Sequence, residues 1–77
     1  MSIQVKYFAG MRERMRRVDD AVDAGGITTV ADVWARVSGN KALPKTVLIA
    51  VNMEYTNLNH EVKDGDEVAF FPPVTGG

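Results

Sequence analysis

The residues best suited to chemistry lie at the end of the sequence, in the stretch "FFPPVTGG" from Phe70 to Gly77. Pro72 and Pro73 lack a backbone N–H and fix φ near about −65°, so they stop sheet pairing and favour a stiff, extended exit of the chain. Gly76 and Gly77 have no Cβ, which keeps the tip thin at the point of deepest insertion. Six extended residues reach at most about 20 Å. We interpret residues 72–77 as an extended, flexible tail that delivers the carboxylate of Gly77 into a pocket of another protein.

The remaining side chains give little support for an independent enzyme. Cysteine is absent, His60 is the single histidine, and no serine or threonine has an evident histidine partner. A metal cluster would need several carboxylates to converge on that one histidine. Asp64, Gly65 and Asp66 resemble part of a calcium loop, but the spaced ligands and the closing Glu are missing. We therefore interpret these three residues as a turn and His60 as an ordinary surface residue, and we expect no metal site.

The elements that would position the tail begin with an alternating segment. In "SIQVKYF", Ile3, Val5 and Tyr7 point to one face, and Phe8 lies on the opposite, wetter face. This alternation predicts a strand. The segment "MRERMRR" predicts a short helix or turn, and "VDDAVDAGG" is compatible with a second strand that ends at the two glycines.

The best-marked element is a helix over residues 29–38. Thr29 followed three residues later by Asp32 matches a capping pair, and Gly39 supplies a left-handed stop. Four apolar residues recur at i, i+3, i+4 and i+7, which predicts one buried stripe. They are Val30, Val33, Trp34 and Val37.

Two more strands follow the helix. The run "TVLIAVN" is apolar and β-branched, as in a covered strand; "NMEY" then predicts a turn and "TNLNHEV" a short polar segment. After the turn at Asp64 and Gly65 comes a strand through Val68, Phe70 and Phe71, in which alternation places one of the two phenylalanines in the core. With one helix to cover one sheet, we expect an α+β fold in a single domain over residues 1–77, with a mixed sheet covered by one amphipathic helix.

Composition limits the partners that the chain can have. Nine Lys and Arg against ten Asp and Glu give a net charge of −1, so there is no overall positive field to attract nucleic acid or an anionic membrane. No apolar run approaches about 18 residues, and the first residues lack the pattern of a signal peptide. A hydrophobic content of 45% with 25% charged residues is typical of a globular protein. We expect a cytoplasmic protein that binds neither nucleic acid nor a membrane.

The strings "VKYFAGMRE", "TTVADVW" and "DGDEVAFFPPVTGG" together resemble the MoaD/ThiS family of ubiquitin-like sulfur carriers. The resemblance covers essentially the whole chain and is most specific from Asp64 onward, where "FFPPVTGG" favours the molybdopterin branch over the thiamine branch. It implies a β-grasp, ubiquitin-like fold and the role of the small sulfur-carrier subunit of molybdopterin synthase.

This resemblance also implies a reaction cycle. An E1-like enzyme of the MoeB type uses ATP and magnesium to adenylate the C-terminal glycine. A sulfur donor, such as a cysteine desulfurase or rhodanese, then displaces AMP to leave a thiocarboxylate. A MoaE-like large subunit, in a heterotetramer of two small and two large subunits, uses this sulfur to convert cyclic pyranopterin monophosphate into molybdopterin. The small subunit is expected to bind no cofactor stably and to leave catalysis to the large subunit.

Carried over by position, Gly77 matches the acceptor of adenylate and sulfur, and Gly76 its narrow approach. Arg12 matches a basic position near the contact with the activating enzyme, although an arginine cluster also suits a solvated face. Tyr55 departs from the family, in which an aliphatic residue is commoner there. The partner-binding residues implied by the resemblance are Phe8, Arg12, Tyr55, Phe71, Pro72, Pro73, Val74 and Thr75.

Other functions remain open from the residues alone. A ubiquitin-like protein modifier would need the same free diglycine but would be recovered covalently joined to lysines of target proteins. A sulfur carrier of thiamine, cysteine or tRNA thiolation would need the same thiocarboxylate. A pure interaction domain would tolerate the loss of Gly77.

Overall fold

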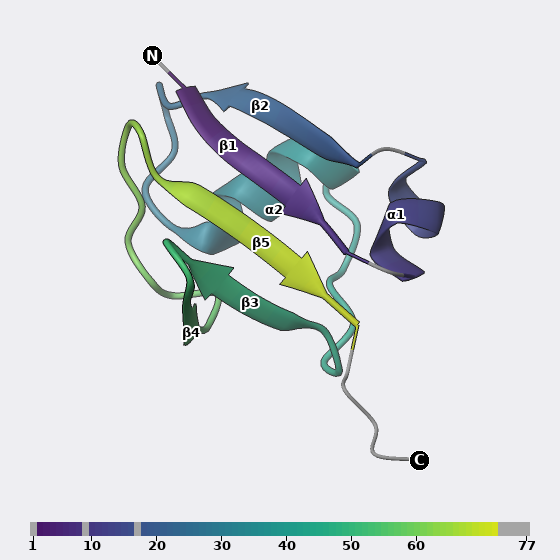
Figure 1. Cartoon of the computed structure of the whole chain (residues 1–77). Coiled ribbons are helices and arrows are strands. Elements are labelled where there is room, and N and C mark those ends of the chain that lie inside the picture. The colour runs from purple at the N-terminus through teal and green to yellow at the C-terminus, as the bar shows by residue number, and fades with distance from the viewer. Residues whose placement is uncertain (1, 9, 17, 73–77) are drawn as a thin grey trace.

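One helix lies across a five-stranded sheet in the computed structural model, which describes residues 2–8, 10–16 and 18–72 (Figure 1). The strands are β1 (Ser2–Tyr7), β2 (Asp19–Asp23), β3 (Leu48–Val51), β4 (Glu54–Thr56) and β5 (Glu67–Phe71). The helices are the short α1 (Gly10–Met15) and the main helix α2 (Val30–Ser38). The predicted α+β architecture, with its mixed sheet and one covering helix, is confirmed.

The sheet has the strand order β2-β1-β5-β3-β4. Its centre is the parallel pair β1 and β5, which come from opposite ends of the chain and lie side by side with Val5 opposite Val68. The other neighbouring pairs are antiparallel. The last strand is therefore held between β1 and β3 up to the residue that precedes Pro72.

The core lies between the sheet and α2, as the alternation in β1 predicts. Ile3, Val5 and Tyr7 are buried, and the four stripe residues of α2 are buried against them. The indole of Trp34 meets the ring of Phe70 edge-on, with 5.1 Å between the ring centroids. Burial of the α2 stripe and of alternate strand residues against each other supplies the main driving force for this two-layer fold.

Both ends of α2 follow the sequence signals. The carboxylate of Asp32 accepts the backbone N–H groups of Thr28 and Thr29 at 2.9 and 3.1 Å. Gly39 has φ 69°, a left-handed conformation that glycine adopts without a Cβ penalty. The N–H of Asn40 then returns to the carbonyl of Ala35 at 3.0 Å. The helix begins at Val30, one residue later than predicted, because Thr29 is the cap.

The prediction for residues 52–62 was partly wrong, because it contained no strand. The turn is confined to Asn52 and Met53, and Glu54–Thr56 forms β4, with Tyr55 opposite Ala50 and Thr56 opposite Ile49. A three-residue edge strand with one paired side contributes few apolar side chains, so its sequence has no periodic signal. Its pairing comes from the tight hairpin rather than from its own residues.

Candidate functional site

Phe70 and Phe71 are neighbours in sequence but lie on opposite faces of the sheet. Phe70 is 0% exposed in the core, whereas Phe71 is half-buried on the face that α2 leaves open. The predicted division of this pair between core and surface is therefore observed. The alternation of β5 thus brings an aromatic ring to the open face at the last residue of the strand.

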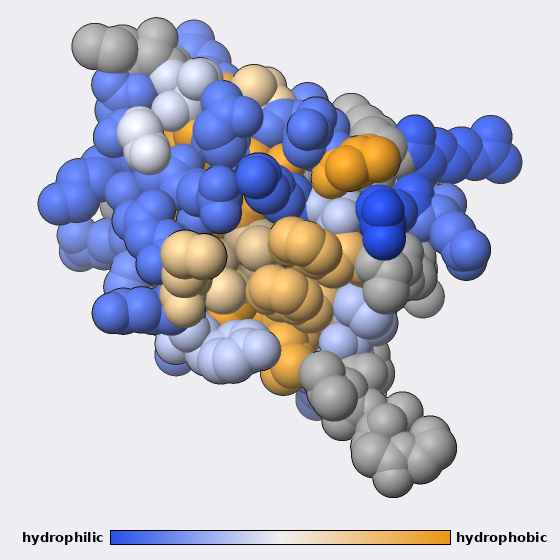
Figure 2. Space-filling view, in the orientation of Figure 1, coloured by the Kyte–Doolittle hydropathy of each residue, from blue (hydrophilic) through white to orange (hydrophobic). Residues whose placement is uncertain are grey.

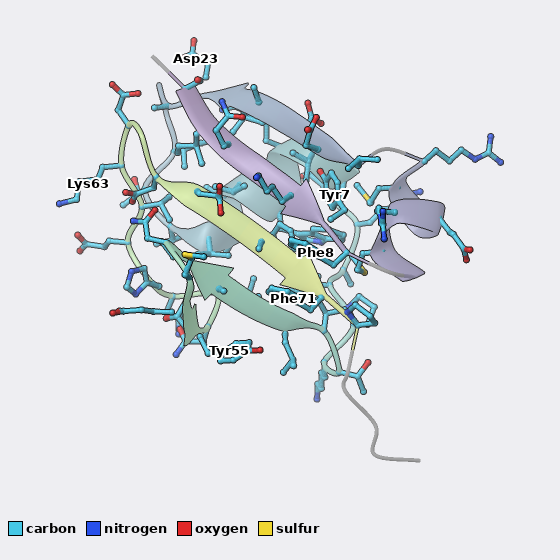
Figure 3. All side chains as sticks on the ribbon, viewed as in Figure 1. Tyr7, Phe8, Asp23, Tyr55, Lys63 and Phe71 are labelled. Carbon is cyan, nitrogen blue, oxygen red and sulfur yellow. The ribbon has the colours of Figure 1, made fainter. Side chains whose placement is uncertain are left out.

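Three aromatic rings meet on this open face (Figure 3). The rings of Phe8 and Phe71 stack in parallel, with 4.7 Å between centroids and 6° between planes. The ring of Tyr55 packs on the other side at 6.1 Å from Phe71, tilted by 60°. The N–H of Phe8 donates to the carbonyl of Phe70 at 3.1 Å, which continues the β1–β5 pairing by one residue. Backbone pairing therefore fixes where Phe8 and Phe71 meet.

Small and branched apolar side chains form the floor between these rings. Leu48 lies opposite Phe71, and Ala50 lies opposite both Ala69 and Tyr55. We call the whole set the aromatic patch: Phe8, Leu48, Ala50, Tyr55, Ala69 and Phe71. Figure 2 shows hydrophobic surface gathered over β3 and β5 on this face. Tyr55 is 72% exposed and Phe8 39% exposed, and an exposed aromatic surface of this kind is typical of a protein-binding site.

The family resemblance implies docking by Phe8, Tyr55 and Phe71, and the structure brings all three together. Leu48, Ala50 and Ala69 are not among the residues that the resemblance implies. Alternation within "VLIAV" carries a signal for two of them, because Leu48 and Ala50 face away from Ile49, which is in the core. Ala69 follows in the same way from the burial of Val68 and Phe70.

Polar groups border the aromatic patch toward the β3–β4 hairpin. Lys6 and Glu67 form an ion pair at 3.5 Å, exposed enough to contribute little to stability. The carboxylate of Asp66 accepts hydrogen bonds from the side-chain amide of Asn52 at 3.0 Å and from the N–H of Lys63 at 2.9 Å. These two hydrogen bonds hold the pKa of Asp66 below its ordinary value. The hairpin is thereby tied to the turn that precedes β5.

Arg12 lies beside the aromatic patch rather than within it. It is exposed on α1, which begins at Gly10, two residues after Phe8, and the N–H of Met11 donates to the carbonyl of Phe8 at 3.0 Å. Met11 is buried and anchors α1 to the core. The structure therefore holds a cationic side chain in solvent on the element that follows the patch residue Phe8.

The tail begins at the edge of the aromatic patch. β5 ends at Phe71, as its two following prolines predict, and Pro72 is half-buried. The assignments to Pro73, Val74, Thr75, Gly76 and Gly77 lie outside the described residues and stay predictions.

Residues 2–8, 10–16 and 18–72 contain neither a metal-binding cluster nor a membrane-spanning helix. These residues contain no group of three or more His, Asp or Glu side chains that could hold a metal ion. Neither of their helices is long and apolar enough to cross a membrane.

The fold and the site define a class of protein. A mixed sheet crossed by one helix is the β-grasp, ubiquitin-like arrangement. In this chain an aromatic patch also lies next to the end of the last strand. The chain belongs to the ThiS family, which matches residues 5–77. It is also 39% identical over 80 residues to the molybdopterin synthase sulfur carrier subunit of Escherichia coli, covering 97% of this chain and 99% of that protein. The family resemblance inferred from the motifs is confirmed.

Solved structures share this arrangement over the full chain. The small archaeal modifier protein SAMP1 from Haloferax volcanii superposes with a TM-score of 0.84 at 29% identity, covering 100% of both chains. The complex of subunits 1 and 2 of the molybdopterin-converting factor from Helicobacter pylori contains a chain that superposes with a TM-score of 0.68 at 26% identity, also covering 100% of both chains.

Proposed function

We propose that this chain is the sulfur carrier of molybdopterin synthase and that the carboxylate of Gly77 is its working group. The observation that carries the proposal is the position of the aromatic patch. Phe71, whose ring belongs to the patch, is the last residue of β5, and the tail begins at the next residue, Pro72. A partner that binds the patch would therefore receive the tail next to its own binding surface. Full-length similarity to a molybdopterin synthase sulfur carrier subunit supports this assignment.

The proposed chemistry takes place at one carbonyl carbon. A free carboxylate is a poor acyl donor, because its oxygen is a poor leaving group, so it needs activation. An E1-like enzyme of the MoeB type would transfer AMP from ATP, with magnesium, to the carboxylate of Gly77 and release pyrophosphate. The persulfide sulfur of a cysteine desulfurase or rhodanese would then displace AMP to form an acyl disulfide. A second thiol would reduce this acyl disulfide, leaving the thiocarboxylate on Gly77 and a disulfide on the donor. Gly76 would let the tip pass through a narrow channel, since it adds no side chain.

The aromatic patch would dock the carrier on a MoaE-like large subunit. The chain of subunit 1 that resembles ours forms a complex with subunit 2 in the Helicobacter pylori protein. Docking would place the thiocarboxylate in the large subunit, where it would supply sulfur to convert cyclic pyranopterin monophosphate into molybdopterin. Two carriers and two large subunits would form the assembly. Arg12, exposed on α1, would contact the activating enzyme during the earlier step.

Protein modification is a second candidate, favoured by the similarity to small archaeal modifier protein 1. It would use the same adenylated glycine but transfer the acyl group to a lysine amine instead of accepting sulfur. The two functions therefore differ in the fate of one activated carboxylate.

Intact-mass spectrometry tests the proposed function directly. The protein is incubated with a MoeB-like enzyme, ATP, magnesium and a sulfur donor, beside a variant that lacks Gly77 and a reaction without ATP. We expect an ATP-dependent mass gain that equals the exchange of one oxygen for sulfur, confined to the C-terminal peptide and absent from both controls. Full-length protein that gains no mass with an active partner contradicts the sulfur-carrier proposal. Recovery as conjugates on lysines would favour the modifier instead.

A further inference from the structure

The hairpin between β3 and β4 contains a residue that does not suit its backbone. Its two loop residues, Asn52 and Met53, have φ of 50° and 71°. Two-residue hairpin loops with positive φ at both positions strongly favour Asn followed by Gly, because a Cβ at positive φ is strained. Asn52 follows this preference, but Met53 places a long apolar side chain where glycine is expected.

Hydrogen bonds account for Asn52. Its backbone N–H donates to the carbonyl of Glu67 at 2.8 Å, its side-chain oxygen accepts the N–H of Glu67 at 3.0 Å, and its amide donates to Asp66. Met53 has no comparable structural reason, because 92% of the residue is exposed to solvent. Its backbone conformation acts against the stability of the free protein, and its exposed side chain gains nothing from folding. Residues of this kind cluster at functional sites, where binding compensates for the strain.

The position of Met53 relates it to the aromatic patch. It lies two residues before Tyr55, whose ring belongs to the aromatic patch, and the hairpin is at the end of β3 that points away from Phe71 (Figure 1). Leu48, at the Phe71 end, and Asn52 are four residues apart along β3, or about 13 Å at the rise of a strand. Met53 thus places an exposed apolar side chain at the far end of β3, beyond the polar groups that border the aromatic patch.

We propose that Met53 is an anchor of the docking surface and inserts into an apolar pocket of the large subunit. This inference rests on the proposed function, since it takes the large subunit as the partner of the aromatic patch. Methionine suits such a contact because its unbranched, polarizable side chain adapts to an irregular pocket. The sequence signal for this anchor is a tight hairpin in which Asn is followed by an apolar residue where glycine is expected.

The test uses substitutions that move stability and affinity in opposite directions. Met53→Gly and Met53→Asn relax the backbone and remove the apolar group, whereas Met53→Leu keeps an apolar group of similar size at the same φ. Phe71→Ala serves as the reference for the aromatic patch. Each full-length variant is titrated into the large subunit from the same genome by calorimetry, and its urea midpoint is measured alone.

We expect Met53→Gly and Met53→Asn to keep or raise the urea midpoint and to weaken binding about tenfold, the order expected for loss of a buried apolar side chain. Met53→Leu should bind within about threefold of the parent. If Met53→Gly and Met53→Asn bind like the parent while Phe71→Ala binds more weakly, Met53 is no anchor and the proposed function stands. If the parent itself does not bind the large subunit, this inference and the proposed partner fall together.

Discussion

The neighbouring side chains of Phe70 and Phe71 have different surroundings, so their loss should have different consequences. Phe70 is fully buried between Trp34 and Tyr7, whereas Phe71 stacks on Phe8 at the open face. Position within one strand therefore separates a residue that supports the core from a residue that we propose for docking. The distinction is measurable because both residues have the same side chain.

Phe70→Ala should lower the free energy of unfolding by about 3 to 5 kcal/mol, because it leaves a cavity in the core. Phe71→Ala should cost about 1 kcal/mol through the lost ring stacking and should weaken binding to the large subunit at least tenfold. Urea unfolding and calorimetric titration measure the two effects. Unchanged affinity for the large subunit in a folded Phe71→Ala protein would show that the aromatic patch is not part of the interface.

The residues that we propose for docking could be predicted only in part from the sequence. Phe8, Tyr55 and Phe71 came from the family resemblance, and alternation alone left open which of Phe70 and Phe71 was exposed. Their meeting depends on cross-strand register, which pairs Tyr7 with Phe70 and Leu48 with Phe71, residues 63 and 23 positions apart in sequence. Such register is set by the whole sheet, so local patterns do not determine it.

Among the elements, α2 was predictable because cap, stripe and stop agree on one interpretation. β4 was not, because it is three residues long and paired on one side only. The difference is physical: α2 contains its own hydrogen bonds, whereas β4 exists through its hairpin and its partner β3.

The cap of α2 should make stability depend on pH. Two backbone N–H groups, of Thr28 and then Thr29, hold the pKa of Asp32 below its ordinary value of 3.8. Since the pKa is depressed in the folded state, the stabilisation is present above about pH 4 and is lost as pH falls through the folded-state pKa. Asp32→Asn should therefore lower the melting temperature at pH 7.

Thermal unfolding of the parent and Asp32→Asn from pH 7 to pH 2 checks this. We expect the difference in melting temperature to shrink steadily below pH 4. A difference in melting temperature that stays constant across this range would show that Asp32 stabilises α2 through its shape and not through its charge.

The other end of α2 gives a second test of the same element. Gly39 has φ 69° and an open space where a Cβ would be, so Gly39→Ala introduces backbone strain without a clash. We expect a loss of about 1 kcal/mol in the free energy of unfolding, read from urea denaturation. Gly25→Ala is the matched control, because the φ of Gly25 is not positive, and an equal loss in both variants would contradict the explanation.

At the scale of the whole molecule, the central feature is the parallel pairing of β1 with β5. The chain's first and last strands complete each other's hydrogen bonding, and Val5 and Val68 are both fully buried. Neither the aromatic patch nor the core can form without both strands. The stability of the domain therefore depends on its last strand, and we expect it not to depend on the diglycine beyond it.

Two truncations test this division. Deletion of residues 76–77 should leave the melting temperature within about 2 °C of the parent and abolish sulfur loading, whereas deletion of residues 67–77 should prevent folding. Circular dichroism with heating separates these results. A large loss of stability on removing the diglycine alone would show that the tail also supports the fold.

The pairing of β1 with β5 also orders events during synthesis. At about 5 to 20 residues per second, the ribosome adds β5 several seconds after β1, and the backbone edge of β1 that pairs with β5 has no partner until then. Folding can be completed only after translation of the segment that leads into the tail. A nascent chain interrupted before β5 would thus present an unfinished sheet to chaperones and proteases, and an activating enzyme that recognises the completed patch would meet only finished chains.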